Sequence, residues 1–259
     1  MNVLQAFLLG IIQGLTEFLP ISSSGHLEIG HALLEIKNEN NLLFVIVVHV
    51  ATVLSTIVVF RKDIGTLLRD LFKFEWNLST KYVSMLLVSS IPIVIIGLLF
   101  KTEIENLFTG NLFFVGCMLL FTACLLTLTV YVKQSDRKIT FAKAFIIGIA
   151  QMLAVLPGIS RSGSTIATGI LLKVKKEDVA RFSFLMVLIP IIGAAVVDIF
   201  SGEITTQNTN FTNLATGFVA AFLTGLLACS WMIKIVKRGK LIYFAIYCAL
   251  IGLIAIFAA

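Results

Sequence analysis

The side chains of this chain that could do chemistry gather in two short segments rich in serine and glycine. The first, Gln13 to His26, holds a carboxylate, three successive serines and an imidazole. The second, Pro157 to Thr165, holds a single arginine, Arg161, among further hydroxyls. These groups are together what phosphoryl transfer requires: a nucleophile, a proton acceptor, a metal site and a clamp for the phosphate oxygens.

Two residues of the first segment could hold a metal ion. Gln13 and Glu17 are four positions apart, so both project from one face of a helix. An amide and a carboxylate so placed suit a hard cation, Mg²⁺ or Ca²⁺, which keeps water or phosphate oxygens as its other ligands. The sequence therefore predicts a divalent cation as cofactor, bound by Glu17 and Gln13.

Both segments also carry features that bind a phosphate. Each places hydroxyls and a glycine at the start of a short helix, where free backbone N–H groups and the helix dipole attract an anion. His26 follows the first glycine and can transfer a proton near neutral pH. The residues expected to contact phosphate are Ser22, Ser24, Gly25, Ser160, Ser162, Gly163, Ser164 and Thr165.

The elements that must position these segments are membrane helices. Of the 259 residues, 58% are hydrophobic and 13% are charged, and the mean hydropathy is +1.02. No stretch between apolar segments is long enough to form a soluble catalytic domain. The basic residues behind the net charge of +6 lie in short loops, which indicates membrane orientation rather than nucleic-acid binding. We expect an all-α polytopic membrane protein.

Segment length separates spanning helices from shorter helix pairs, because a bilayer core about 30 Å thick takes about 20 apolar residues of helix. Six segments are long enough: 42–60, 82–100, 111–132, 181–200, 214–236 and 241–258. The two pairs within 3–36 and 141–172 break at Pro20 and Pro157. They are predicted to be re-entrant hairpins, whose irregular tips must be buried in protein or line a wet cavity.

The two hairpins are related by duplication. A shift of 138 residues aligns 6–25 with 144–163, and ten of those twenty positions are identical. The chain thus divides into a first repeat, 1–132, and a second, 141–259, each with one hairpin followed by three spans. Three spans are an odd number, so the second hairpin must enter from the opposite face. The tips of such an inverted repeat meet near the midplane and build a site there.

The distribution of charge gives the expected orientation. Seventeen of the 20 basic residues lie in loops on one face, and Lys37 and Lys101 lie on the other. By the positive-inside rule the first face is cytoplasmic, so both termini and the mouth of the first hairpin are expected outside.

Arg161 is the one basic residue left at membrane depth. An arginine there costs several kcal/mol and marks a functional site by default. The alternative is that Arg161 only pairs with Glu17 and holds the two repeats together.

The segments Gln13-Gly-Leu-Thr-Glu17-Phe-Leu-Pro-Ile-Ser-Ser-Ser-Gly-His26 and Pro157-Gly-Ile-Ser-Arg161-Ser-Gly-Ser-Thr closely resemble two known signature motifs. They are those of the bacterial undecaprenyl-diphosphate phosphatases, the bacitracin-resistance family, and the resemblance extends over the whole chain. It implies a multi-pass plasma-membrane enzyme that removes the terminal phosphate of undecaprenyl diphosphate, with a divalent cation. The product would return to peptidoglycan synthesis as the carrier lipid of the cell wall.

By position, the resemblance makes Glu17 the essential acid, Ser23 the nucleophile, His26 its proton partner and Arg161 the diphosphate clamp. From the residues alone, any of three neighbouring serines could be the nucleophile, and direct attack by water on the phosphate stays open. Helix capping would use the serines on either side of Ser23, which favours Ser23 as the free one. Gln13 stands where many family members have a second Glu, so Glu17 is the only acid in the tip.

A transporter or flippase for a phosphorylated lipid is the alternative function, because inverted repeats with broken helices also build secondary transporters. A transporter needs the anion clamp but has no use for a serine beside a histidine. His49 lies in the middle of the span 42–60 and is expected to be a buried polar contact rather than a catalyst under either function. A homodimer and the preferred lipid length are left open.

Overall fold

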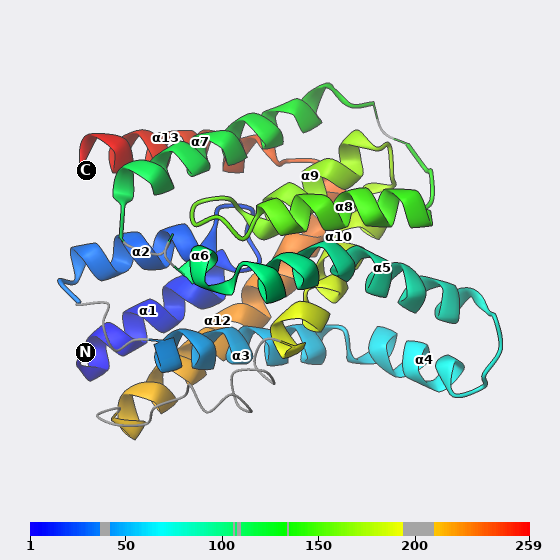
Figure 1. Cartoon of the computed structure of the whole chain (residues 1–259), viewed down its shortest axis with the longest axis horizontal. Helices are drawn as coiled ribbons and strands as arrows, with labels where there is room; N and C mark the ends of the chain where they lie inside the picture. Colours follow the sequence, from blue (N-terminus) through cyan, green and yellow to red (C-terminus); the bar gives the residue numbers. More distant parts are fainter. Residues whose placement is uncertain (37–41, 106, 108–109, 134, 194–209) are drawn as a thin grey trace.

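The computed structural model describes residues 1–36, 42–105, 107, 110–133, 135–193 and 210–259 (Figure 1). Apart from an isolated β-bridge between Arg137 and Val174, the regular elements of these ranges are helices. In chain order the elements are α1 (Val3–Thr16), α2 (Ser23–Leu33), α3 (Leu42–Val59), α4 (Arg61–Leu71), α5 (Leu78–Leu99), α6 (Lys101–Glu105), α7 (Leu112–Leu128), η2 (Thr129–Tyr131), α8 (Phe141–Leu153), α9 (Arg161–Leu171), α10 (Lys176–Met186), α12 (Phe211–Arg238) and α13 (Ile242–Phe257).

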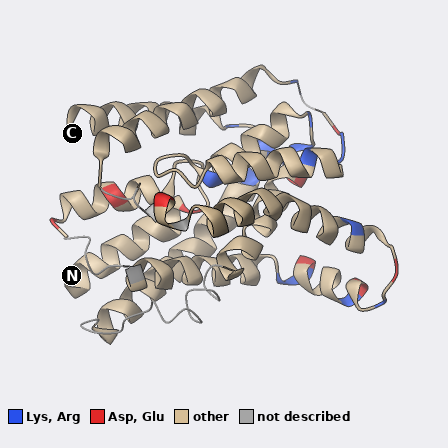
Figure 2. Ribbon diagram, in the orientation of Figure 1, with Lys and Arg blue, Asp and Glu red and all other residues tan. Residues whose placement is uncertain are grey.

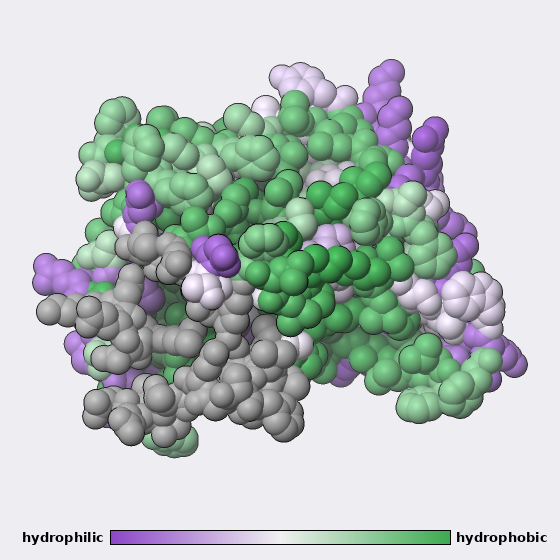
Figure 3. Space-filling model, viewed as in Figure 1, coloured by the Kyte–Doolittle hydropathy of each residue, from purple (hydrophilic) through white to green (hydrophobic). Residues whose placement is uncertain are grey.

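Three helices in the described ranges are long and apolar enough to cross a membrane: α5, α12, and α7 extended by η2. A fourth crossing arises if α3 and α4, which meet at a 76° bend, count as one span. Apolar side chains cover the flanks of the molecule, and polar ones gather toward its ends (Figure 3). The expected all-α, multi-pass membrane protein is confirmed.

The segment expected as one span over 181–200 is interrupted. Helix α10 begins earlier, at Lys176, and ends at Met186, four residues before Pro190. A proline inside a helix removes a hydrogen bond, and its ring clashes with the carbonyl group four residues back. The prediction of a continuous helix was therefore wrong at 187, and 194–200 lie outside the described residues.

Each short helix pair folds back on itself as a hairpin, with α1 packed against α2 and α8 against α9. The first helix of each pair ends four residues before its proline, at Thr16 and at Leu153. The second helices begin at Ser23 and Arg161, three and four residues after those prolines, because the hydroxyls of Ser22 and Ser160 cap them and start a regular turn at once. Arg161 is consequently the first residue of a helix rather than part of the turn.

Helices of one repeat pack mainly against helices of the other. Helix α1 lies along α12, α8 lies along α5, and α7 lies along α13. Small residues permit the close approach: a Cβ added to Gly10 would lie 2.9 Å from the Ala220 Cβ, and one added to Gly116 would lie 2.7 Å from the Gly252 carbonyl oxygen. Each repeat therefore depends on the other for its packing. The inverted orientation of the repeats across a bilayer stays a prediction.

Charged residues are distributed unevenly along the bundle (Figure 2). Lys and Arg gather at the end that holds α4 and the α7–α8 connection, and both termini lie at the opposite end (Figures 1 and 2). One end of the molecule is therefore basic, as the positive-inside rule requires. The assignment of that end to the cytoplasm, with both termini outside, stays a prediction.

Candidate active site

The tips of the two hairpins are in contact. Ser162 Oγ donates a hydrogen bond to the Leu19 carbonyl oxygen at 3.0 Å. A Cβ added to Gly25 would lie 3.2 Å from the Gly158 Cα, so the backbones of the tips nearly touch. Gly158 has a φ of 98°, which disfavours any side chain, and an added Cβ would lie 2.5 Å from the Val115 carbonyl oxygen. The two tips and α7 thus close around one another.

An ion pair joins the tips. Glu17 follows α1 directly, and its Oε1 lies 2.6 Å from Nη2 of Arg161 at the start of α9. The exposed fractions of the two side chains are 7% and 14%. Arg161 Nη1 also donates to the Ser183 carbonyl oxygen at 3.3 Å. The arginine that stands alone at membrane depth therefore has the carboxylate partner that such a charge requires.

Ser23 contacts the other oxygen of the same carboxylate. Its hydroxyl donates to Glu17 Oε2 at 2.6 Å, and Gln13 Nε2 donates to that oxygen at 3.0 Å. The structure thus brings together four of the predicted site residues from both hairpins, Gln13, Glu17, Ser23 and Arg161. The group placed to accept the Ser23 proton is the carboxylate of Glu17.

His26 bonds to other partners than this cluster. Its Nδ1 lies 2.8 Å from the Ser22 carbonyl oxygen, and its Nε2 lies 2.8 Å from the Tyr247 hydroxyl on α13. The hydrogen bond between Ser23 and His26 that the sequence suggested is not formed, because Ser23 bonds to Glu17 instead. Tyr247 lies 221 residues along the chain from His26, so no local spacing could have pointed to it.

His49 is the residue that sequence reasoning valued too little. Its Nε2 lies 3.9 Å from Glu17 Oε2, and its Nδ1 lies 2.8 Å from the Val45 carbonyl oxygen. The side chain is 27% exposed, so His49 makes partly exposed polar contacts rather than the buried contact expected of it. A titratable residue in the middle of an apolar helix was the available signal.

The outer serines of both tips serve as helix caps. Ser22 Oγ accepts a hydrogen bond from the Gly25 N–H at 3.2 Å, and Ser160 Oγ accepts one from the Gly163 N–H at 3.0 Å. Ser22 has a φ of 69°, a strained value for a residue with a side chain that costs about 1–3 kcal/mol. Such strain is typical of functional sites, where the surrounding structure holds it in place.

The remaining hydroxyls expected to contact phosphate differ in their surroundings. Ser24 Oγ lies 3.3 Å from Ser22 Oγ. Thr165 donates to the Arg161 carbonyl oxygen at 2.9 Å, on the side of α9 that faces α10. Ser164 Oγ is buried and has no hydrogen-bond partner among the described residues. Their contact with phosphate stays a prediction.

Comparison with known proteins identifies the family. The family model for bacitracin resistance protein BacA matches residues 6–254. The chain belongs to the BacA family. An undecaprenyl-diphosphatase of Christiangramia forsetii is 54% identical over 100% of this chain and 99% of its own length. One of Bacteroides fragilis is 55% identical over 99% and 98%, and one of Methanosphaera stadtmanae is 39% identical over 99% and 98%.

The divalent cation implied by the resemblance to the BacA family fits the residues of the first tip. Gln13 Oε1 is buried without a partner among the described residues, although the amide nitrogen of the same side chain bonds to Glu17. Across the described ranges, no group of three His, Cys, Asp or Glu could hold a metal ion alone. One carboxylate and one amide oxygen suit a hard cation that takes its other ligands from water and phosphate.

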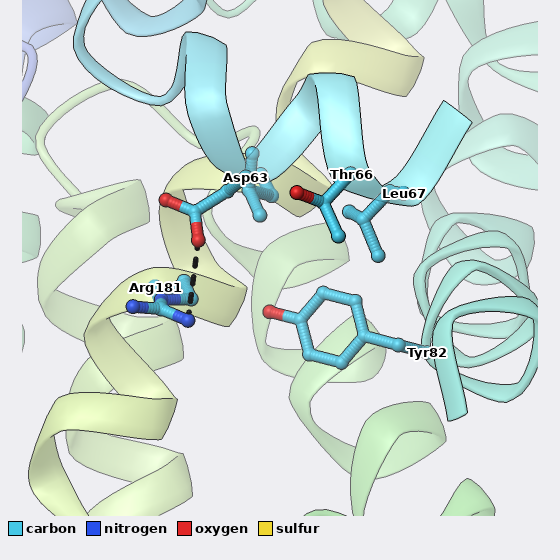
Figure 4. Close-up of a pocket in the computed structure, with 6 residues that line it drawn as sticks. Asp63, Thr66, Leu67, Tyr82 and Arg181 are labelled. Atoms are coloured by element: carbon cyan, nitrogen blue, oxygen red, sulfur yellow. Dashed lines mark ion pairs between the residues drawn. The ribbon is translucent and has the colours of Figure 1, made fainter. Parts of the chain in front are cut away.

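A small pocket of about 210 Å³ lies elsewhere in this BacA-family protein, at the basic end. It is lined by Asp63, Thr66, Leu67, Tyr82, Arg181 and Leu185 (Figure 4). Arg181 Nη1 lies 3.2 Å from Asp63 Oδ1 across it. None of the predicted site residues lines this pocket, so it contributes nothing to the cluster around Glu17.

Proposed function

We propose that this chain hydrolyses the terminal phosphate of undecaprenyl diphosphate and releases undecaprenyl phosphate and inorganic phosphate. The full-length relatives named undecaprenyl-diphosphatase support this substrate. The observation that carries the reaction is the position of Glu17, whose two oxygens lie 2.6 Å from Ser23 Oγ and from Arg161 Nη2. A nucleophile, its proton acceptor and a cationic clamp therefore occupy one small volume.

Arg161 supplies the clamp. A guanidinium has five N–H donors in a planar fork. In Arg161, one hydrogen bond goes to Glu17 and one to the Ser183 carbonyl oxygen. The remaining donors can reach two oxygens of a phosphate together, which stabilises the charge that develops in the transition state. The free N–H groups at the start of α2 and α9 add further donors.

Ser23 is the proposed nucleophile. Its Oγ forms a bond to the terminal phosphorus while the bond from that phosphorus to the bridging oxygen breaks, and undecaprenyl phosphate leaves. The Ser23 proton passes to Glu17 Oε2, its hydrogen-bond partner. Water then attacks the phosphoserine, the proton returns from Glu17 to Ser23 Oγ, and inorganic phosphate leaves. In the alternative route, Glu17 activates water for direct attack.

Glu17 and Gln13 are the residues that would hold the divalent cation, Mg²⁺ or Ca²⁺. When bound, such a cation neutralises charge on the diphosphate oxygens. Gln13 Oε1 needs no rearrangement of existing bonds to serve as a ligand, because it has no partner among the described residues. Glu17 would share its carboxylate between the cation and the donors already bonded to it, Arg161 at Oε1 and Ser23 and Gln13 at Oε2.

The proposed location is the bacterial plasma membrane, with the site open to the outer face and both termini outside. The basic end opposite the termini supports this orientation (Figure 2). The isoprenyl chain would remain among the lipids while only the diphosphate reaches the two tips. A homodimer is compatible with this arrangement, and no feature of the site requires one.

Phosphate release by the detergent-purified protein tests the function against the transporter alternative. Hydrolysis needs neither a membrane potential nor a second compartment, so wild-type protein should release phosphate from undecaprenyl diphosphate in micelles. The same preparation with Glu17→Gln is the matched control and should release almost none. A folded wild-type protein that releases no phosphate in micelles, yet moves phosphorylated lipid across vesicle membranes, would establish the transporter instead.

A further inference from the structure

His26 and Tyr247 form a stacked, hydrogen-bonded pair beside the first tip. Their rings are stacked with centroids 5.6 Å apart and an interplanar angle of 11°. The Tyr247 oxygen lies 2.8 Å from His26 Nε2, and Tyr247 is 38% exposed. The next residue, Cys248, donates to the Pro20 carbonyl oxygen at 3.5 Å, so α13 is attached to the first tip at two adjacent positions.

The two hydrogen bonds determine where the proton of a neutral His26 lies. The Ser22 carbonyl oxygen can only accept, so the nitrogen beside it, Nδ1, must carry the hydrogen. His26 Nε2 then holds the lone pair and accepts the hydrogen of the Tyr247 hydroxyl. If Nε2 gains a proton, the same hydroxyl can turn and accept from it. The phenol therefore suits both protonation states of the histidine.

This arrangement closes both nitrogens of His26 to direct proton exchange with a substrate. Nδ1 is taken by the backbone and Nε2 by Tyr247. We propose that Tyr247 is a further catalytic residue, whose hydroxyl relays a proton between the attacking water and His26. The inference rests on the proposed phosphatase function and on its phosphoserine route.

The second step of that route supplies the need for such a relay. Glu17 already holds the proton taken from Ser23, so the attacking water requires another acceptor. Water gives a proton to the Tyr247 oxygen as the phenol gives its own to His26 Nε2, and the hydroxide oxygen bonds to phosphorus as the bond to Ser23 Oγ breaks. Tyr247 ends neutral and His26 ends protonated, and that proton is later returned to water.

A Tyr247→Phe variant tests the relay, because it keeps the stacked ring and removes only the hydroxyl. Tyr243→Phe is the matched control, since Tyr243 lies one turn earlier on α13 and is 63% exposed. Assays of phosphate release should show kcat lowered at least about tenfold in Tyr247→Phe and KM unchanged. This loss is smaller than the effect of removing a whole acid–base group, because His26 itself remains. Phosphate label should accumulate on Ser23 of this variant and not on the control.

Two results would overturn the relay. One is a kcat of Tyr247→Phe equal to that of wild type, and the other is an equal loss of kcat in Tyr247→Phe and Tyr243→Phe. Wild-type turnover is measured alongside, so a failure of the phosphatase function itself is seen separately. If Tyr247→Phe does not fold, ¹⁵N NMR of wild-type protein labelled at its three histidines remains decisive. His26, assigned with His26→Gln, should carry its proton on Nδ1, and a proton on Nε2 in the neutral ring would contradict the proposal.

Discussion

Replacing Arg161 with Lys separates the two roles that this residue could have. The structure places Arg161 in a buried ion pair with Glu17, which is also what a purely structural arginine would form. Lysine keeps the positive charge that pairs with Glu17. It loses the planar fork, which beyond its bonds to Glu17 and the Ser183 carbonyl oxygen could hold two phosphate oxygens together. A structural role should therefore survive the change largely intact, whereas a phosphate clamp should not.

The size of each effect follows from the geometry. Two unit charges about 4 Å apart attract by about 4 kcal/mol at an effective dielectric constant of about 20, so a lysine still compensates the Glu17 charge. Losing the bidentate grip on phosphate should lower turnover about a hundredfold, roughly 2.7 kcal/mol of transition-state stabilisation. Arg161→Met, by contrast, leaves Glu17 buried and unpaired, which costs about 3–5 kcal/mol of folding free energy.

Phosphate release and thermal unfolding in the same detergent measure the two effects. Arg161→Lys should unfold close to the wild-type temperature and turn over at least about a hundredfold more slowly. The control is Arg181→Lys, because Arg181 also pairs with a carboxylate, at 3.2 Å, but lies at the basic end with a side chain 57% exposed. It should change neither quantity appreciably. Wild-type turnover in a folded Arg161→Lys protein would refute the clamp and leave only the structural pair.

Three further predictions concern the other residues of the tips. Ser23→Ala and His26→Ala should each remove most of the phosphate release and the double variant little more, because both residues would serve one route through phosphoserine and losses within one route are not additive; substantial turnover by Ser23→Ala would instead make water the attacking group. Chelation of divalent cations should stop hydrolysis, Glu17→Gln should need far more metal, and Gln13→Glu should keep activity; undiminished turnover of Glu17→Gln in excess chelator would remove the cation from the mechanism. Single cysteines are placed at Ser24 and Ser162 in a background without the four native cysteines. Each should be protected from a bulky impermeant thiol reagent added from the far face of the membrane. Full labelling of position 162 from outside together with position 24 from the cytoplasm would contradict the hairpin placement.

The duplicated motifs predicted that the two tips meet and bring their charged residues together. Arg161, the one basic residue outside the loops, and Glu17, the one acid of the first tip, lie 2.6 Å apart, which is the pairing that the sequence offered as the alternative to a phosphate clamp. Helix ends were less predictable, because capping by Ser22 and Ser160 starts α2 and α9 earlier than hydrophobicity alone suggests. The break at 187 could have been read from Pro190.

The surroundings of the histidines could not be predicted from spacing. His26 is three residues from Ser23, which suggested a nucleophile and its base, but a histidine one turn along a helix need not face the same neighbour. Its partner comes from α13, and the imidazole beside Glu17 comes from α3. Both contacts arise from packing between helices that are distant in the sequence, and neither motif shows which distant helix packs against it.

The two tips are alike in the arrangement of their helices and unlike in chemistry, and the proposed site depends on that difference. Ser23 and Arg161 correspond under the shift of 138 residues, and each is the first residue of an 11-residue helix after a serine cap. Both lie 2.6 Å from the Glu17 carboxylate, one at each oxygen. The equivalent of Glu17 in the second tip is Val155, so only one carboxylate serves both. In the proposed reaction, a symmetric pair of serines would lack a clamp for the phosphate, and a symmetric pair of arginines would lack a nucleophile. Duplication thus supplies two equivalent positions at one carboxylate, and divergence at those positions supplies the two roles of the proposed reaction.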